Sequence, residues 1–163
     1  SYHNIIIKNG VIQGMGNNGV DCENFCRLQD LSVAQSGNNG IDSNRPGLIE
    51  GCTVQLSNMD GINVSGGTIR DSQSLWNGND GMVTGAGILS GNYVAGNYDD
   101  GIVCQNCVLI DNISAGNYWT GFEFSGDHPA FGRNMTRGNG GGCVLGTAAD
   151  MGGNICNGSP YSP

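Results

Sequence analysis

The chain has 163 residues, enough for one domain, and no shift in composition along it marks a linker. Six basic residues against 14 acidic ones give a net charge of −8, which argues against nucleic acids and anionic membrane surfaces as partners. Apolar runs such as residues 5–7 are far too short to cross a bilayer, so we expect no membrane span.

A glycine followed by an apolar residue recurs at near-constant spacing along the whole chain, which is the mark of a repeat architecture. After each glycine, apolar and mostly polar positions alternate, which is the period of a strand with one buried face. The repeated pairs are Gly19-Val20, Gly40-Ile41, Gly61-Ile62, Gly81-Met82, Gly101-Ile102, Gly121-Phe122 and Gly142-Cys143.

Two further apolar sets recur in each repeat and predict two more short strands. One set is Ile7, Leu28, Ile49, Ile69, Leu89, Leu109 and Ala130, and the other is Ile12, Val33, Val54, Val94 and Ile113. Three strands per repeat without a helical stripe predict an all-β fold, a right-handed parallel β-helix (solenoid) of about seven coils. A sandwich or barrel would show hairpin signals between unequal strands instead.

Equivalent residues of successive coils should lie about 4.8 Å apart, so each aligned position becomes a ladder. An asparagine recurs at Asn58, Asn77, Asn97, Asn117 and Asn139. Stacked amides can hydrogen-bond from coil to coil, and Asn beside Gly suits tight corners, so we expect a structural role for this ladder.

The segment "NIIIKNGVIQGMGNNGV", the steps "GNDGM" and "YDDGI" and the closing "NMTRGNGGGCVLG" resemble the right-handed parallel β-helix repeat proteins of bacteria, the pectate-lyase-like and NosD-like group. The resemblance covers nearly the whole chain. It implies the fold but not one activity, because that group includes lyases, hydrolases, uronan epimerases and phage tail proteins. The motifs of its epimerases and polygalacturonases match this sequence only loosely.

The carboxylates Asp60, Asp80 and Asp100 fall in one column, with Asp99 beside it. Repulsion along such a row should raise pKa values or recruit a cation, and calcium is the ion that these oxygen ligands suit. A second interpretation makes Asp80, Asp99 and Asp100, with His128, the acids and base of a catalytic site. A third makes each aspartate a turn cap, which the asparagines at positions 18 and 39 favour.

Four aromatic residues lie in turn-like stretches near these acids: Trp76, Tyr98, Tyr118 and Trp119. Tyr98 and Tyr118 are one repeat apart, so we expect them to stack in neighbouring coils. Flat exposed rings beside carboxylates suit the faces of sugars, and an aromatic patch can equally contact another chain.

Seven cysteines offer three local pairs: Cys22 with Cys26, Cys104 with Cys107, and Cys143 with Cys156. Cys52 is left over. Two histidines argue against a zinc cluster, so the pairs are either oxidised staples or buried thiols. We expect at least one disulfide and an extracytoplasmic location, secreted or periplasmic.

Taken together, the sequence favours a noncatalytic extracytoplasmic module of residues 1–163 that binds a polysaccharide or cell-surface glycan. The alternative is a polysaccharide-active enzyme, a uronan lyase, epimerase or glycoside hydrolase, that uses the carboxylate row with calcium as its possible cofactor. Because the chain opens within a coil, we also expect an N-terminal cap, from a longer chain or from another one, over the first strand edge.

Overall fold

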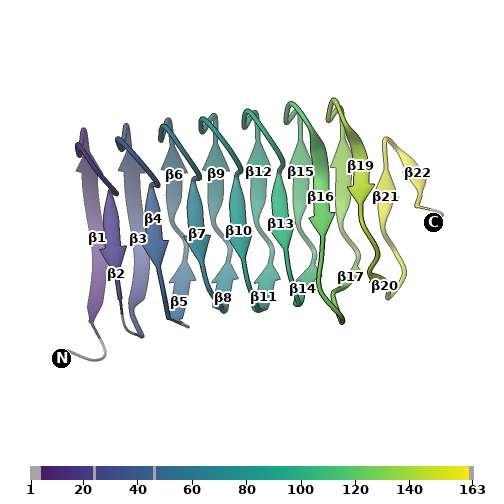
Figure 1. Cartoon of the computed structure of the whole chain (residues 1–163), viewed down its shortest axis with the longest axis horizontal. Coiled ribbons are helices and arrows are strands. Elements are labelled where there is room, and N and C mark those ends of the chain that lie inside the picture. Colours follow the sequence, from purple (N-terminus) through teal and green to yellow (C-terminus); the bar gives the residue numbers. More distant parts are fainter. Residues whose placement is uncertain (1–4, 24, 46, 162–163) are drawn as a thin grey trace.

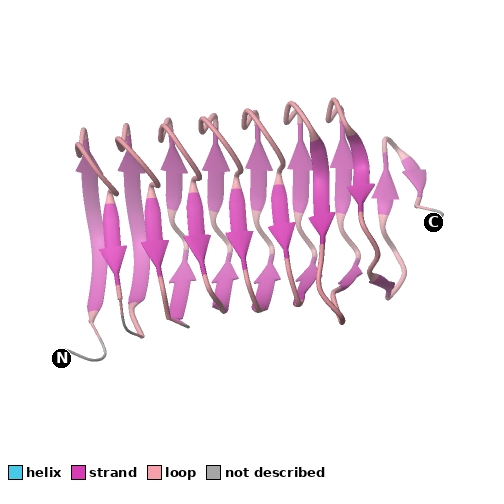
Figure 2. Ribbon diagram, viewed as in Figure 1, coloured by secondary structure: helices cyan, strands magenta, loops and turns pink. Residues whose placement is uncertain are grey.

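The computed structural model describes residues 5–23, 25–45 and 47–161. The described chain winds into a solenoid whose two ends lie at opposite ends of its long axis (Figure 1). Strands and turns account for all of the regular structure in it, as Figure 2 shows, which confirms the all-β parallel solenoid predicted from the repeat. None of the described residues belongs to a helix with the length and hydrophobicity that crossing a bilayer requires.

One wall of the solenoid is a seven-stranded parallel sheet, formed by the strand that follows each repeated glycine. The pairing is in register from coil to coil, with Ile62, Met82 and Ile102 in one column. Its strands are β2 (Val20–Cys22), β4 (Ile41–Ser43), β7 (Ile62–Val64), β10 (Met82–Thr84), β13 (Ile102–Cys104), β16 (Thr120–Phe124) and β19 (Gly142–Leu145).

The other two strand columns join into one 15-stranded sheet, because the first two coils cross both columns with a single long strand. These long strands are β1 (Ile6–Gln13) and β3 (Arg27–Ala34). One column continues as β5 (Gly47–Glu50), β8 (Gly67–Arg70), β11 (Gly87–Ser90), β14 (Cys107–Ile110), β17 (Ala130–Gly132) and β20 (Ala149–Asp150). The other continues as β6 (Thr53–Gln55), β9 (Gln73–Leu75), β12 (Tyr93–Ala95), β15 (Ile113–Ala115), β18 (Met135–Arg137) and β21 (Ile155–Cys156), which pairs antiparallel with β22 (Ser159–Pro160).

Six of the seven repeated glycines, Gly19 to Gly121, are required by close approach rather than by an unusual backbone angle. Gly142 is the exception, with a φ of 113° and open space at its Cβ position. A Cβ on Gly81 would lie 2.6 Å from the carbonyl oxygen of Gly101 and would also overlap Val94 on the opposite wall. A Cβ on Gly61 would lie 2.7 Å from the carbonyl oxygen of Gly81. The glycines therefore stack in a file, and side chains of the opposite wall, such as Val94, pack directly against its backbone.

Three positions of the predicted register are wrong. Leu109 pairs with Phe131 rather than with Ala130, and Val94 pairs with Ser114 rather than with Ile113. In the last coil Phe122 pairs with Val144, not with Cys143. The steps from Leu109 to Phe131 and from Phe122 to Val144 are longer than those of the preceding coils, so a constant period misaligned the last coils by one residue. The error at Ser114 has another cause, because this buried serine stands where the preceding coil has an apolar residue, Val94.

Asparagine ladders mark two of the three bends that join the strand columns. The upper ladder holds Asn77, Asn97, Asn117 and Asn139, and each backbone N–H donates to the side-chain oxygen of the next coil at 2.9–3.0 Å. Exposed Asn58 is not part of it, because Ser57 takes that place. A second set, the rear ladder, was not predicted and holds Asn92, Asn112, Asn134 and Asn154. Positive φ angles belong to the residue before each ladder position, such as Gly96 or Asp111, and not to the asparagines.

All three cysteine pairs form disulfides, and Cys52 is free and buried. Cys104 and Cys107 follow Thr84 and Gly87 in the columns of one interior corner, and Cys22 and Cys26 occupy the same corner near the N-terminal end. Cys52 stands in the rear-ladder column, where its N–H donates to the hydroxyl of Ser72 at 3.2 Å. The unpaired cysteine therefore replaces a ladder residue.

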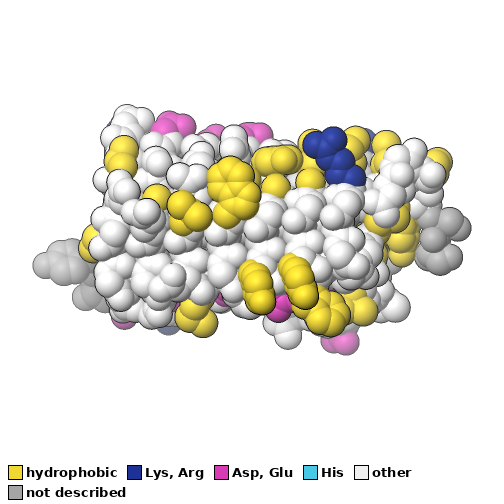
Figure 3. All heavy atoms as spheres, turned by 90° about the horizontal axis from the view of Figure 1, so that it is seen from above, with side chains coloured by type: hydrophobic (Ala, Val, Ile, Leu, Met, Phe, Trp, Pro, Cys, Tyr) yellow, Lys and Arg dark blue, Asp and Glu magenta, His cyan; other side chains and the backbone are white. Residues whose placement is uncertain are grey.

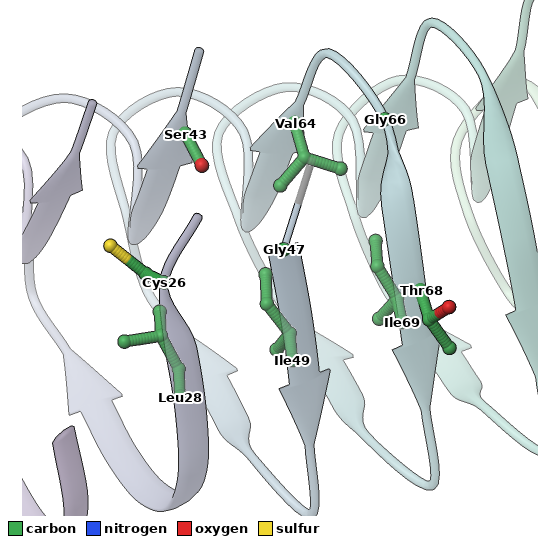
Figure 4. A pocket seen from close by; sticks show the side chains of 9 residues that line it. All are labelled: Cys26, Leu28, Ser43, Gly47, Ile49, Val64, Gly66, Thr68 and Ile69. Carbon is green, nitrogen blue, oxygen red and sulfur yellow. The ribbon is translucent and has the colours of Figure 1, made fainter. Parts of the chain in front are cut away.

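Among the described residues, an interior cavity at a corner of the early coils is too small for an organic ligand. A cavity of about 10 Å³, close to the volume that one water needs, lies at the corner where Ser43 and Gly47 replace the bulkier pair of the first coil (Figure 4). It is lined by Cys26, Leu28, Ser43, Gly47, Ile49, Val64, Gly66, Thr68 and Ile69.

Candidate functional site

The candidate site lies on the turns that lead into the seven-stranded sheet. These upper turns, residues 56–61, 76–81, 96–101 and 116–119, stand along the top of Figure 1. In each one a bend residue is followed by a ladder position and, three residues after that position, by an aspartate or, in the last case, Thr120 at the start of β16. The upper ladder therefore fixes the backbone from which the candidate residues project.

The aspartate column acts as a set of caps between coils. A side-chain oxygen of Asp80 accepts the N–H of Asp100 at 2.9 Å, and Asp100 accepts the N–H of Thr120 at 2.6 Å. Asp60 accepts the N–H of Asp80 at 3.3 Å and the amides of Asn63 and Asn79 at 2.8 and 2.7 Å. The capping interpretation is correct, but each side chain caps the following coil rather than its own turn.

Burial and repulsion change the acidity of this row, as expected from its spacing. Burial, together with the charges of Asp60, Asp99 and Asp100, raises the pKa of Asp80 to about 7. Burial and the neighbouring carboxylates also raise the pKa of Asp99. The row thus carries less than its full negative charge near neutral pH.

Glu123 joins the acidic cluster, although no pattern in the sequence singled it out. A hydrogen bond with the carboxyl group of Asp100, followed by burial, raises the pKa of Glu123 to about 7. Glu123 lies on β16, in the coil after Asp100. The only signal for it was a polar residue at an outward strand position that holds Val83 and Val103 in the two preceding coils.

Asp80, Asp99 and Asp100 have carboxylate oxygens within 4.8 Å of one another, so these three could hold a cation. Asp60, expected as a ligand, lies outside this group, and its two oxygens already accept hydrogen bonds. Calcium takes six to eight oxygen ligands, and three carboxylates can supply part of that number. The three carboxylates are thus the type of ligand that calcium takes.

His128 is not brought to the acids. It is exposed in the loop after β16, whereas the aspartate row precedes the strands of that sheet. The N–H groups of Asp127 and His128 donate to the side-chain oxygen of Asn106 at 2.8 and 3.3 Å. At roughly 3.3 Å per residue, the five residues of β16 alone separate the two places by more than about 10 Å.

The aromatic residues do come together. Tyr98 and Tyr118 stack with ring centroids 5.3 Å apart and an angle of 6° between the ring planes, as predicted from their spacing. Their exposed fractions are 68% and 64%, and those of Trp76 and Trp119 are 57% and 56%. Figure 3, which looks onto the upper turns, shows hydrophobic side chains gathered on this face.

Two open clefts flank the tyrosine stack. One, of about 470 Å³, is lined by Trp76 and Tyr98 and by residues of the two preceding turns. The other, of about 550 Å³, is lined by Tyr118, Trp119 and the glycines of the following turn. Both volumes are of the size that small-molecule sites have, about 300–1,000 Å³. The four aromatic residues selected from the sequence thus lie at these two clefts.

Comparison with known proteins shows the fold and no more. No protein-family model matches the chain, and no curated protein sequence matches it. Among solved structures, the periplasmic alginate epimerase AlgG superposes with a TM-score of 0.66 at 16% sequence identity. The match covers 85% of this chain and 44% of the epimerase, so this chain spans less than half of that protein.

Proposed function

We propose that this chain is an extracytoplasmic module that binds carbohydrate through the aromatic side chains of its upper turns, without catalysing a reaction. The observation that carries the proposal is the exposed stack of Tyr98 and Tyr118 between two clefts, each with a tryptophan in its wall. Aromatic rings that are held rigidly and left open to solvent are suited to the apolar faces of sugar rings.

The acidic row supports binding rather than catalysis. Asp60 and Asp100 are only 6% and 5% exposed, and both use side-chain oxygens to hold the backbone of the next coil. A general acid or nucleophile has to reach its substrate, which these two side chains do not. The row therefore serves first to fix the turns that carry the aromatic rings.

Two further findings agree with this proposal. Three disulfides are typical of proteins that fold outside the reducing cytoplasm, where glycans of cell surfaces and matrices are found. The superposed β-helix protein is named as a periplasmic enzyme of alginate, so this architecture is compatible with polysaccharide as a partner.

A glycan array, probed with and without calcium, tests the proposal. Tyr118→Ala should weaken binding to the glycans that the wild type retains by at least ten-fold, because it removes one wall of a cleft. Asp100→Asn should leave binding within about two-fold, since an asparagine keeps the oxygen that caps Thr120. Ile88→Ala, an exposed aliphatic residue of β11, is the matched control for loss of surface hydrophobicity. An array on which the wild type retains no glycan would refute the proposal.

A polysaccharide-active enzyme is the second candidate, and one observation favours it. Asp80 and Glu123 both have a pKa of about 7, near the operating range of a general acid or base, in a cluster that also includes Asp99. Incubation with polyuronates and neutral polysaccharides, with calcium added or chelated, would reveal new chain ends or epimerised units. Turnover that Asp80→Asn and Glu123→Gln each abolish would select the enzyme over the binding module.

A further inference from the structure

The tyrosine stack ends at a glycine on both sides. The position that holds Tyr98 and Tyr118 is occupied by Gly78 in the preceding coil and by Gly140 in the following one, since each of the four directly follows an upper-ladder asparagine. A third ring cannot extend the stack in either direction. Each tyrosine therefore has one face against its partner and one face toward a coil without a side chain at that position.

The exposed fractions agree with this arrangement. The rings are nearly parallel with centroids 5.3 Å apart, so one face of each is covered, yet each side chain remains about two-thirds exposed. Because the two rings stack and belong to neighbouring coils, their faces point broadly along the long axis of the solenoid, and the covered faces are the ones between Tyr98 and Tyr118. The free face of Tyr98 looks toward Gly78, and the free face of Tyr118 looks toward Gly140.

A tryptophan accompanies each free face. Trp76 lines the cleft of Tyr98, and its indole lies so close over Gly96 that a Cβ there would meet it at 2.5 Å. Trp119 lines the cleft of Tyr118 together with Gly138 and Gly140. The chain has two tryptophans in all, one for each cleft.

We infer that the two clefts are separate sugar subsites, each of which stacks one sugar ring on the free face of a tyrosine, and that a glycan long enough to bridge them binds both. The inference rests on the proposed function and adds the number of subsites and their geometry. Gly78 and Gly140 are three coils apart, so the subsites lie roughly 14 Å from each other at about 4.8 Å per coil.

The chemistry of the clefts favours a sugar over an apolar partner. Each cleft has a flat aromatic wall beside polar surface: the cleft of Tyr118 is floored mainly by glycine backbone. The cleft of Tyr98 combines glycine backbone with Ser57, Asn58 and Asn77, and Leu56 is its one aliphatic lining residue. A pyranose matches both surfaces, since it has an apolar C–H face and hydroxyl groups around its rim. A lipid or an aliphatic side chain would cover the polar backbone without replacing its hydrogen bonds to water.

The orientation of the rings also limits how a glycan lies. Sugar rings that stack on the free faces stand across the solenoid axis, whereas the rings of an extended chain running along the axis would meet only the edges of Tyr98 and Tyr118. The subsites thus favour chain ends, branches or a bent chain over the interior of a straight one. Joining two weak subsites through one ligand raises the apparent affinity by the effective concentration of the second contact.

One substitution can fill one subsite without touching an aromatic residue. Gly116 lies two residues before Tyr118 at the bend position that Trp76 occupies two coils earlier, and a Cβ on it would meet nothing within 4 Å. Gly116→Trp should therefore place an indole over Gly138, in the cleft of Tyr118, as Trp76 lies over Gly96. Gly14→Trp is the matched control, because Gly14 has the same positive φ and free space at the same bend, far from both clefts.

Tryptophan fluorescence and titration calorimetry test the inference, with cello-oligosaccharides and alginate oligosaccharides, from disaccharide upward, as neutral and anionic probes. In Trp119→Phe the remaining fluorescence comes from Trp76 and reports the cleft of Tyr98. In Trp76→Phe it comes from Trp119 and reports the cleft of Tyr118. Disaccharides should perturb both reporters weakly and independently. Bridging oligosaccharides should bind at least ten-fold more tightly at one per protein, and Gly116→Trp should abolish that gain while Gly14→Trp preserves it.

The outcomes separate the two levels of the claim. Binding that perturbs one reporter alone, or a length dependence that Gly116→Trp leaves unchanged, overturns the two-subsite inference and leaves carbohydrate binding in place. Failure of both probes and of the array to give binding overturns the proposed function. A dimer that Gly116→Trp dissociates, measured by sedimentation, would show that a second copy occupies the clefts, and would overturn both.

Discussion

The coils before Asn77 and those after it form the same upper bend with different side chains. The early coils hold Ser36 and Ser57 at the ladder position, and within the described structure neither hydroxyl has a hydrogen-bond partner. Asn77, Asn97 and Asn117 each donate a side-chain amide to the asparagine of the next coil, and Asn139 is the last acceptor of this ladder. Tyr98 and Tyr118, whose rings stack, directly follow Asn97 and Asn117. The candidate binding face therefore lies on coils that are joined by side-chain hydrogen bonds.

The upper asparagine ladder therefore restrains the backbone near the aromatic rings, in addition to stabilising the fold. At the upper bend the hydroxyls of Ser36 and Ser57 form no bond to the described residues of a neighbouring coil, yet the early coils keep the same strand register. Asparagine adds side-chain bonds of 2.9 Å along the column, such as the amide of Asn97 donating to Asn117. Rings that must hold a fixed spacing for a ligand benefit from that extra restraint.

The largest effect is expected from breaking the asparagine ladder. Asn97→Ala removes the oxygen that accepts two bonds from Asn77 and the amide that donates to Asn117. We expect the free energy of unfolding, measured by chemical denaturation, to fall by roughly 3 kcal/mol, since buried partners are left unpaired. Ser57→Ala in the early coils should change it by less than about 0.5 kcal/mol, and equal losses in the two variants would contradict the comparison.

A pH dependence should come from the acidic coils. The pKa of Asp80 is raised to about 7 in the folded chain, so between the ordinary carboxyl range and pH 7 the folded state holds a proton that the unfolded state has lost. The free energy of unfolding should therefore fall as pH rises through this window and level off above it. After allowance for solvent screening of a partly exposed group, the fall is about 1–2 kcal/mol.

The matched variants for this slope are two aspartate-to-asparagine changes. Asp80→Asn should reduce the slope of unfolding free energy against pH and leave the share that comes from Glu123, whose pKa is also raised to about 7. Asp21→Asn changes the net charge equally on an exposed side chain and should preserve the whole slope. A slope that Asp80→Asn leaves unchanged would contradict the part assigned to Asp80.

Extending the ladder should stabilise the early coils modestly. In Ser57→Asn the new amide can donate to the side-chain oxygen of Asn77, as Asn77 does to Asn97. We expect a gain of about 1 kcal/mol, the usual net value of one buried hydrogen bond. A loss in the denaturation midpoint would show that the early bend lacks room for the longer side chain.

The smallest effect is expected at Cys52. Burial raises the pKa of its thiol, so the native protein should react with a thiol reagent only as fast as it opens. Cys52→Ser should cost less than about 1 kcal/mol, because Ser72 at the same position one coil later donates to a carbonyl oxygen as Cys52 does to that of Glu50. Rapid labelling of the folded chain would contradict the burial of this ladder position.

The repeat made most of the fold predictable, since a near-constant period converts sequence spacing into vertical contact. The stack of Tyr98 on Tyr118 followed from it directly. The clefts did not, because they depend on missing side chains at Gly78 and Gly140 and on the direction of an indole. Glu123 was missed since its partner, Asp100, lies in another coil and at another position of the repeat. The predicted pairing register was wrong by one residue in the last coils, because these coils are longer than the preceding ones.

The disulfides have a mechanical consequence. Their partners are 4, 3 and 13 residues apart in sequence, so each bridge among the described cysteines closes a loop shorter than one coil. None of them fastens distant coils to one another. A pull on either terminus can therefore unwind the coils one after another with every bridge intact, and resistance to that tension comes from strand pairing and from the asparagine columns.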